Sequence, residues 1–233
     1  SCKDYLLLID KNFIHLRHMR MESSTAQKVA EYLLQIKAIK LKPENPFTWA
    51  SGWKSPIYCD NRITLSYPNI RTFLRDSMAN EIKRRYPEVK AIAGVTTGAI
   101  GIGMLVADAL GLPFMYVRPA PKKHGRQNQI EGHYDPSAPT VVVEDLISTG
   151  KSSLQAVDAL RKENVNVLGM VALFSYEFEV ATKNMHDAHI ELTTLSGYEA
   201  LIDTAIATNY IAPDQEDVLK KWREAPQLWE PKS

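Results

Sequence analysis

Hydrophobic residues gather in short continuous runs that alternate with longer segments of helical spacing. The short runs predict buried strands at 89–95, 114–117, 140–143, 165–174 and 190–194. The helical spacing predicts helices at 100–110, 152–163, 180–185, 199–207 and 215–223. Strands that alternate with helices predict an α/β fold, with a central parallel sheet flanked by helices on both faces.

The N-terminal part of the chain has a different pattern. Ser24 or Thr25 can cap a helix whose apolar positions continue to Ile39. The stretch 47–60 alternates short extended pieces around glycine and proline. An amphipathic helix is then predicted over 68–86, where a proline follows it.

The apolar stretch 91–117 is long enough to be weighed as a membrane span, and Asp108 is its only charge. Glycines and threonines interrupt it, so a strand, a tight loop, a helix and a second strand explain it better. The net charge of the 233 residues is +1, which favours neither nucleic acid nor a membrane surface as a partner. Cys2 and Cys59 form no disulfide framework and no metal motif, as expected in a reducing cytoplasm.

The first twenty residues differ from the rest of the chain. An apolar run at 5–9 is too short for a membrane span, and no small-residue cleavage site follows it. Met21 opens a segment that looks like an ordinary protein start. We therefore expect 1–21 to be an N-terminal extension without function, and the domain to occupy 22–233.

The strongest chemical pattern follows the strand predicted at 140–143. Two adjacent carboxylates, Glu144 and Asp145, precede a loop rich in serine, threonine and glycine that opens a helix. In an open α/β sheet, ligands bind at the carboxyl ends of the strands. Backbone N–H groups, loop hydroxyls and the positive end of the helix would together form a cup for a phosphate monoester. The carboxylates beside it suit ribose hydroxyls, or a metal held through water.

Three other interpretations of these loops are weaker. An ordinary capped turn does not explain two carboxylates directly after a buried strand, because an unpaired buried charge is costly. The sequence Gly150-Lys151-Ser152 matches the end of an ATPase P-loop, but the first glycine of that motif would fall at Asp145. The glycines at 98, 101 and 103 have the wrong spacing for a dinucleotide-binding loop.

The segment that begins with the two carboxylates resembles the motif by which type I phosphoribosyltransferases bind phosphoribosyl pyrophosphate (PRPP). The resemblance implies that Glu144 and Asp145 meet the ribose hydroxyls. It also implies that the loop residues wrap the 5′-phosphate: Leu146, Ile147, Ser148, Thr149, Gly150, Lys151 and Ser152. The small residues at 94–100 are similar to the pyrophosphate loop, which implies contacts from Thr97 and Gly98.

A long polar loop over 118–139 carries several cationic groups. Cations that close over pyrophosphate stabilise the charge of the leaving group, above all once water is excluded. For an isolated lysine pair, a solvated surface loop is the alternative. The spacing resembles the catalytic loop of orotate phosphoribosyltransferases, which implies that Arg118, Lys122 and His124 grip the pyrophosphate. Lys123 is a candidate replacement for the lysine that many members carry where this chain has Pro119. His124 is also a candidate proton donor, and the resemblance implies a homodimer in which each loop reaches the neighbouring site.

The segment 47–60 resembles the N-terminal signature of the same family, which builds a hood over the base. The resemblance implies backbone contacts from Tyr58 and Cys59 to orotate. Lys54 is a candidate partner for a carboxylate, as a point charge, with an ordinary surface lysine as the alternative. Ser148 is implied as a further orotate contact.

The chain also departs from the family pattern. Some members carry a cation where this chain has Ala50, Gly98 or Pro119, and another subgroup has an arginine near Tyr176. The C-terminal part, 195–202, resembles the subgroup without that arginine. The partner of the orotate carboxylate is therefore less fully explained than the phosphate contacts.

The resemblance covers about 22–207 and implies a type I phosphoribosyltransferase fold, with a small N-terminal hood formed by about 22–66 and C-terminal segments. It implies transfer of ribose 5-phosphate from PRPP to orotate, giving orotidine 5′-monophosphate and pyrophosphate in de novo pyrimidine biosynthesis. The implied catalytic residues are Arg118, Lys122, His124 and Asp145. Mg²⁺ is the implied cofactor, held mainly by PRPP near Glu144 and Asp145, with no firm protein ligand.

Two rival functions share parts of this pattern. A phosphoribosyltransferase for a purine or for uracil would keep the phosphate cup, but the hood argues against it. A regulator that senses PRPP without catalysis would be expected to carry a basic face, which the nearly neutral chain lacks.

Overall fold

A computed structural model describes residues 25–118, 120 and 128–231. Its central sheet has six strands in the order β10-β9-β8-β5-β6-β7, and all neighbours except β6 and β7 run parallel. The strands are β5 (Ala91–Val95), β6 (Phe114–Val117), β7 (Ile130–Glu131), β8 (Thr140–Ile147), β9 (Val167–Ser175) and β10 (Leu192–Gly197). The predicted α/β fold with a central, mostly parallel sheet is confirmed.

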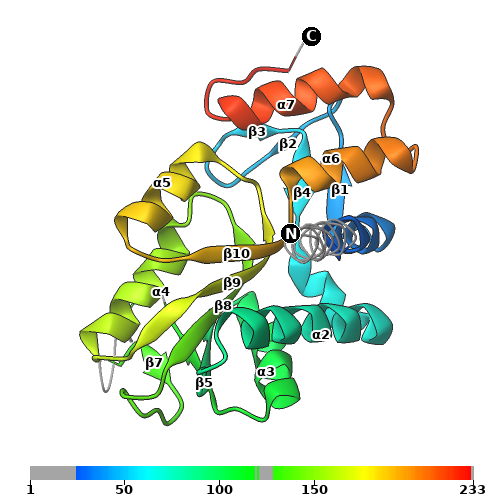
Figure 1. Ribbon diagram of the computed structural model, residues 1–233. Coiled ribbons are helices and arrows are strands. Elements are labelled where there is room, and N and C mark those ends of the chain that lie inside the picture. The colour runs from blue at the N-terminus through cyan, green and yellow to red at the C-terminus, as the bar shows by residue number, and fades with distance from the viewer. Residues whose placement is uncertain (1–24, 119, 121–127, 232–233) are drawn as a thin grey trace, which may run out of the picture.

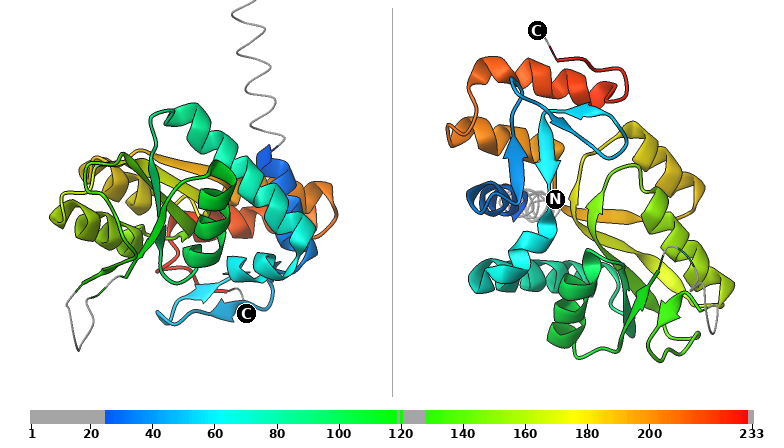
Figure 2. Two further views of the ribbon diagram at one scale, coloured as in Figure 1. Left: turned by 90° about the horizontal axis from the view of Figure 1, so that it is seen from below. Right: turned by 180° about the vertical axis from the view of Figure 1, so that it is seen from behind.

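Helices cover both faces of this sheet (Figures 1 and 2). The described part of the first helix spans 25–35. The other helices are η1 (Asn61–Ser66), α2 (Pro68–Arg85), α3 (Ala99–Leu110), α4 (Lys151–Lys162), α5 (Glu179–Asp187), α6 (Tyr198–Ala207), η2 (Pro213–Gln215) and α7 (Glu216–Glu224). No helix in the described part of the chain is long and apolar enough to cross a membrane. The apolar stretch 91–117 forms strand β5, helix α3 and strand β6 instead of a membrane span.

The alternation of side chains along β5 divides the core in two. Ile92 packs with apolar residues of α2 and α3, whereas Ala91 and Ala93 pack with those of α4 and α5. Every residue of β5 is buried, because successive side chains point to opposite faces and helices cover both. This double burial explains why the central strands read as continuous apolar runs.

Three details differ from the predictions. Ile39 was expected in the first helix, but it begins strand β1, because the helix ends at residue 35 and Lys37 adopts a positive φ of 59°. The polar loop after β6 contains β7, which pairs antiparallel at the sheet edge. Strand β8 extends to Ile147 instead of ending at residue 143, because β9 continues the ladder beside it.

The hood is built from four short strands and the helices that lie beside them. Strand β1 (Ile39–Leu41) pairs with β4 (Ile57–Cys59), and β2 (Phe47–Thr48) pairs with β3 (Lys54–Ser55). Figure 1 shows α6 and α7 next to these strands, although they come from the other end of the chain. Two-stranded ladders are marginal alone, so the hood depends on this packing.

An aromatic cluster joins α7 to the hood and to the end of β9. Trp222 is fully buried and its ring lies 5.4 Å from Trp49, 6.0 Å from Tyr176 and 5.5 Å from Tyr198. Its Nε1 donates a hydrogen bond of 3.1 Å to the carbonyl oxygen of Lys54 in β3. One side chain of the C-terminal helix therefore fixes both the core and the hood backbone.

We expect Trp222→Phe to lower the free energy of unfolding by about 1–2 kcal/mol, because an aromatic ring still fills most of the site but the bond to Lys54 is lost. Trp222→Ala should cost about 3–5 kcal/mol through the cavity it leaves. Urea denaturation measures both. Trp53→Phe, a matched change at a partly exposed hood tryptophan, should cost less than about 1 kcal/mol. Equal effects at the two tryptophans would contradict this role for Trp222.

Candidate active site

Glu144 and Asp145 lie near the carboxyl end of β8, at the centre of the sheet. Strand β8 has β5 on one side and β9 on the other, and Glu144 stands opposite Ala172 of β9. The side chain of Glu144 is only 4% exposed, while that of Asp145 is half-buried. The pair therefore presents one carboxylate to the site and keeps the other inside the protein.

Hydrogen bonds hold the buried carboxylate of Glu144. The Ser153 hydroxyl donates to its Oε2 at 2.7 Å, and the backbone N–H of Asp145 donates to its Oε1 at 2.9 Å. Burial nevertheless raises the pKa of Glu144 well above its usual value, and the neighbouring Asp145 adds to the effect. Glu144 therefore retains its proton at a higher pH than an exposed carboxyl does.

Asp145 lies against the backbone of the loop that follows β5. A Cβ atom at Gly98 would come within 2.2 Å of the Asp145 Oδ2 atom. Any residue other than glycine at position 98 would have to displace this carboxylate. The loop of small residues and the acidic pair, predicted from separate parts of the sequence, thus meet at one place.

The predicted phosphate cup is the turn between β8 and α4. Gly150 precedes α4 with φ 77° and ψ 0°, a left-handed conformation that suits glycine. The first N–H groups of α4 lack partners within the helix, as at every helix start, and they lie in this turn. Asn184 of α5 donates 2.9 Å to the carbonyl oxygen of Thr149, which fixes the turn from outside.

A cleft of about 390 Å³ brings these parts together. It is lined by the predicted residues Thr97, Gly98, Glu144, Asp145, Leu146, Ser148, Thr149, Gly150, Lys151 and Ser152, together with Cys59 of the hood. Ile147, also predicted to bind PRPP, is fully buried in the core and is not among the lining residues. The arrangement can hold a phosphate at the cup and polar hydroxyls at the acidic pair.

Arg118 reaches the neighbouring part of the site. It lines an adjoining cleft of about 330 Å³ that shares Thr96 and Thr97 with the first. Its Nη1 lies 3.8 Å from the Glu131 Oε1 of β7. The other predicted loop residues, Lys122, Lys123 and His124, lie outside the described residues.

Of the three hood residues predicted to bind orotate, only Cys59 lines the cleft. The Lys54 Nζ donates 2.7 Å to the Thr48 hydroxyl, and Tyr58 is 41% exposed; neither lines the cleft. Cys59 does line it, and its thiol donates 3.2 Å to the Asn61 Oδ1. Burial raises the pKa of this thiol, so it stays protonated. The predicted orotate contacts of Lys54 and Tyr58 remain predictions.

Three residues that follow Cys59 belong to the site although no sequence pattern predicted them. Asp60, Asn61 and Arg62 all line the cleft. Asn61 is only 3% exposed, and its Nδ2 donates 2.7 Å to the carbonyl oxygen of Asp145, which is 84 positions away. No local pattern shows such a long-range bond, although the run of polar residues after a short strand was visible.

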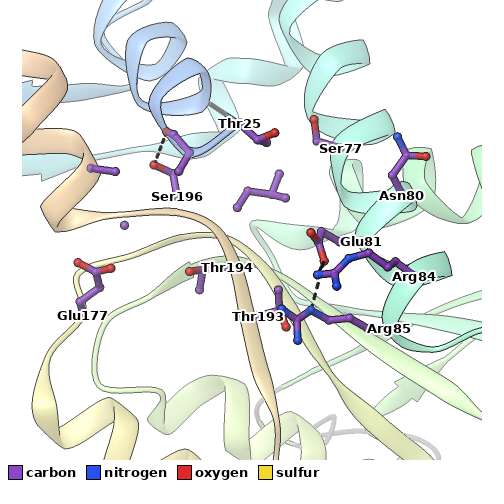
Figure 3. Close-up of a pocket in the computed structure, with 14 residues that line it drawn as sticks. Thr25, Ser77, Asn80, Glu81, Arg84, Arg85, Glu177, Thr193, Thr194 and Ser196 are labelled. Carbon is purple, nitrogen blue, oxygen red and sulfur yellow. Dashed lines mark hydrogen bonds and ion pairs between the residues drawn. The ribbon is translucent and has the colours of Figure 1, made fainter. Parts of the chain in front are cut away.

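A second cleft, of about 520 Å³, lies between α2 and β10 (Figure 3). It is larger, but none of the predicted site residues lines it. Its arginines are already engaged with acids: Arg84 and Arg85 both bond to Glu81, and Arg85 also bonds to Glu191. The predicted site residues therefore meet at the smaller cleft, not at the larger one.

The described residues contain no group of three or more His, Cys, Asp and Glu side chains that would hold a metal alone. The half-buried carboxylate of Asp145 beside a phosphate cup fits Mg²⁺, which usually takes one or two carboxylates and completes its shell with substrate oxygens and water. Thr96–Thr97, at the start of the small-residue loop, is a cis peptide.

Comparison with known proteins defines the class and then the family. No protein-family model matches the chain. The crystal structure of an orotate phosphoribosyltransferase from Aeropyrum pernix superposes with a TM-score of 0.69 at 24% identity, covering 79% of this chain and 99% of that one. The fold is therefore that of the type I phosphoribosyltransferases.

The sequence narrows this class further. The chain is 56% identical over 201 residues to the orotate phosphoribosyltransferase of Bacteroides fragilis, covering 86% of this chain and 95% of that protein. It is 52% identical over 201 residues to that of Porphyromonas gingivalis, covering 86% and 96%. The chain belongs to the orotate phosphoribosyltransferase family.

The raised pKa of Glu144 predicts a dependence of stability on pH. Between the usual carboxyl pKa of 4.5 and the raised value, the folded chain keeps a proton that the unfolded chain has released. Stability is therefore lost as pH rises through that window. Glu144→Gln removes the effect, so its free energy of unfolding relative to the parent chain should increase with pH, by up to about 1.4 kcal/mol per pH unit.

Urea denaturation at several pH values, without PRPP and with a metal chelator, measures this difference. The exposed Glu88→Gln serves as the matched control and should follow the parent chain at every pH. If the Glu144→Gln and parent curves stay parallel, Glu144 does not carry the buried proton.

Proposed function

We propose that this protein transfers ribose 5-phosphate from PRPP to orotate, forming orotidine 5′-monophosphate and pyrophosphate. The observation that carries the proposal is the acidic pair at the end of β8, next to a phosphate cup and under a hood. The nitrogen of orotate, once its proton has been released to solvent, forms a bond to the anomeric carbon while the bond to pyrophosphate breaks. Pyrophosphate leaves with the electron pair, so positive charge develops on the ribose.

The cup and the acidic pair position the sugar. The 5′-phosphate binds the N–H groups at the start of α4 and the hydroxyls of Ser148, Thr149 and Ser152, where the helix dipole favours an anion. Asp145 accepts from the ribose hydroxyls, and its negative charge stabilises the positive charge of the transition state. Glu144 holds the backbone of Asp145 through the bond from its N–H.

The pyrophosphate lies between the small-residue loop and the basic loop. Thr97 and Gly98 approach it through the backbone, since a side chain at position 98 would meet Asp145. Arg118, Lys122, Lys123 and His124 neutralise the charge that leaves with the pyrophosphate. Mg²⁺, held mainly by PRPP near the acidic pair, supplies further charge neutralisation when bound.

Orotate lies between the hood and the cup. Ser148 donates from the cup side, and the backbone at Tyr58 and Cys59 contacts the ring from the hood side. Orotate presents a nitrogen that is easily deprotonated, so no strong general base is required. We further propose that the protein works in the cytoplasm, where the thiol of Cys59 stays reduced.

Turnover of orotate tests the proposed reaction directly. With purified protein, the orotate absorbance should fall only when PRPP and Mg²⁺ are both present, and uracil, hypoxanthine and adenine should give no product. Asp145→Asn should reduce kcat by about 100-fold or more, because a charge at the transition state is removed. Product from another base would contradict the assignment of the substrate. Tight PRPP binding without any turnover would indicate a sensor instead.

Mixing two inactive variants tests whether the basic loop over 118–139 is shared between subunits. Lys122→Ala and Asp145→Asn should each be nearly inactive alone. We propose that the loop of each subunit serves the active site of its partner in a homodimer. Co-refolding the two variants in equal amounts should then restore roughly a quarter of the parental activity, since about half of the dimers are mixed and each mixed dimer has one intact site out of two. Lys122→Ala mixed with His124→Ala, both in the loop, should restore none. Activity of the first mixture equal to the mean of its components would contradict a shared site.

A further inference from the structure

The cleft has an unusual charge for the substrate proposed above. Its described lining includes the carboxylates of Asp60 and Asp145, with the buried Glu144 behind them, yet orotate itself carries a carboxylate. Among the described lining residues, the cations are Arg62 and Lys151. Lys151 is the first residue of α4, at the phosphate cup. Only Arg62 places a positive charge on the hood side, where the base is expected.

We propose that Arg62 binds the carboxylate of the pyrimidine substrate and thereby selects a carboxylated base over a neutral one. This inference rests on the proposed function and deepens it. It assigns the charge partner that Ala50 and Tyr176 do not supply and that Lys54, bonded to Thr48, does not bring into the cleft.

The contacts of Arg62 leave one edge of its guanidinium open. Its Nε donates 2.8 Å to the Asp60 Oδ1, and its Nη2 donates 3.0 Å to the Asp60 Oδ2. Asp60 thus occupies the side edge formed by Nε and Nη2. The end edge formed by Nη1 and Nη2 has no partner among the described residues, and it matches a second carboxylate in the same bidentate geometry.

The backbone around Arg62 is fixed toward the site. The Asp60 Oδ1 also accepts from the Arg62 N–H at 3.2 Å, which caps helix η1. Asn61 is bonded to the carbonyl oxygen of Asp145, and the Thr64 hydroxyl donates 2.6 Å to the carbonyl oxygen of Asn61. Since the backbone is held at both ends of this turn, Arg62 stays at the cleft that Asp145 also lines. The Arg62 side chain is 59% accessible to solvent, so it can contact a ligand in the cleft.

The pairing with Asp60 also suits a selective contact. A guanidinium already bonded to one carboxylate carries little excess charge, so it binds a second carboxylate by geometry as much as by attraction. A neutral base such as uracil has no carboxylate that fits the end edge. It would forgo the bidentate contact that orotate makes, and that difference would produce the discrimination.

Arg62→Gln and Arg62→Lys test the contact, with orotate and its methyl ester as paired substrates. Arg62→Gln should lower kcat/KM for orotate by roughly 10- to 100-fold and leave kcat/KM for the ester nearly unchanged. The preference of the parent enzyme for orotate over the ester should therefore shrink by the same factor. Arg62→Lys keeps the positive charge but loses the bidentate geometry, so its kcat/KM for orotate should lie between those of Arg62→Gln and the parent enzyme.

PRPP binding provides the second measurement. Its dissociation constant, measured by calorimetry, should change by less than about twofold in both variants, because the phosphate contacts lie elsewhere. Arg75→Gln is the matched control: Arg75 also pairs with an adjacent aspartate at 2.8 Å, on α2 outside the cleft, and this variant should retain parental kinetics. Thermal unfolding of each variant confirms that the fold is intact.

Two results would overturn the inference. One is an equal loss of kcat/KM for orotate and for the ester; the other is a PRPP dissociation constant that weakens as much as orotate kcat/KM falls. If the parent enzyme turns over orotate, either result overturns the role of Arg62 and leaves the proposed function intact. If the parent enzyme does not turn over orotate, the proposed function and the role of Arg62 both fail.

Discussion

Glu144 is buried where β8 ends, and its carboxyl group receives two hydrogen bonds, from the Ser153 hydroxyl and from the N–H of Asp145. The first bond joins strand β8 to helix α4 across the phosphate cup. The second fixes the backbone of the exposed partner in the acidic pair. Because an unpaired polar group at this depth would be costly, both neighbours are constrained by the same carboxyl. The shape of the cup and the direction of Asp145 thus have one physical cause.

Three side chains fix the hood by donating to backbone carbonyl groups. Asn61 donates to Asp145 and so ties the hood to this centre, Trp222 of α7 donates to Lys54, and Trp49 donates 3.0 Å to Ile57 within the hood. Each donor is a side chain, and the bonds of Asn61 and Trp222 span 84 and 168 positions of sequence. The short strands of the hood are too small to be stable alone, so these bonds and the aromatic cluster define the position of the hood. In the proposed function the C-terminal helix therefore supports the base site, although it carries none of the predicted contact residues.

Much of this could be predicted from local patterns. Strand β8, the acidic pair and the cup lie within a dozen or so residues, so their arrangement follows from the strand and helix periods alone. The sheet followed from the alternation of elements, because the central strands are buried on both faces. The end of the first helix near Lys37 and the short edge strand β7 were missed, since tertiary packing decides both. Asn61 and Arg62 were missed for a related reason: their roles depend on a carbonyl group and a cleft contributed by a distant segment. The contacts proposed for Lys122 and His124 stay predictions, because these residues lie outside the described part of the chain.

The distribution of charge within the cleft matches the order of events in the proposed reaction. A net charge of +1 gives no overall attraction for an anionic substrate, so each anion must find its own partner. In the proposed binding mode the phosphate meets helix N–H groups, which carry partial charge without a titrating group. The sugar, which becomes positive only during the reaction, would meet Asp145. An unpaired arginine beside Asp145 would cancel that effect, whereas Arg62 already shares its charge with Asp60. On this proposal the Asp60–Arg62 pair can bind a carboxylate close to the ribose while leaving the field of Asp145 largely intact.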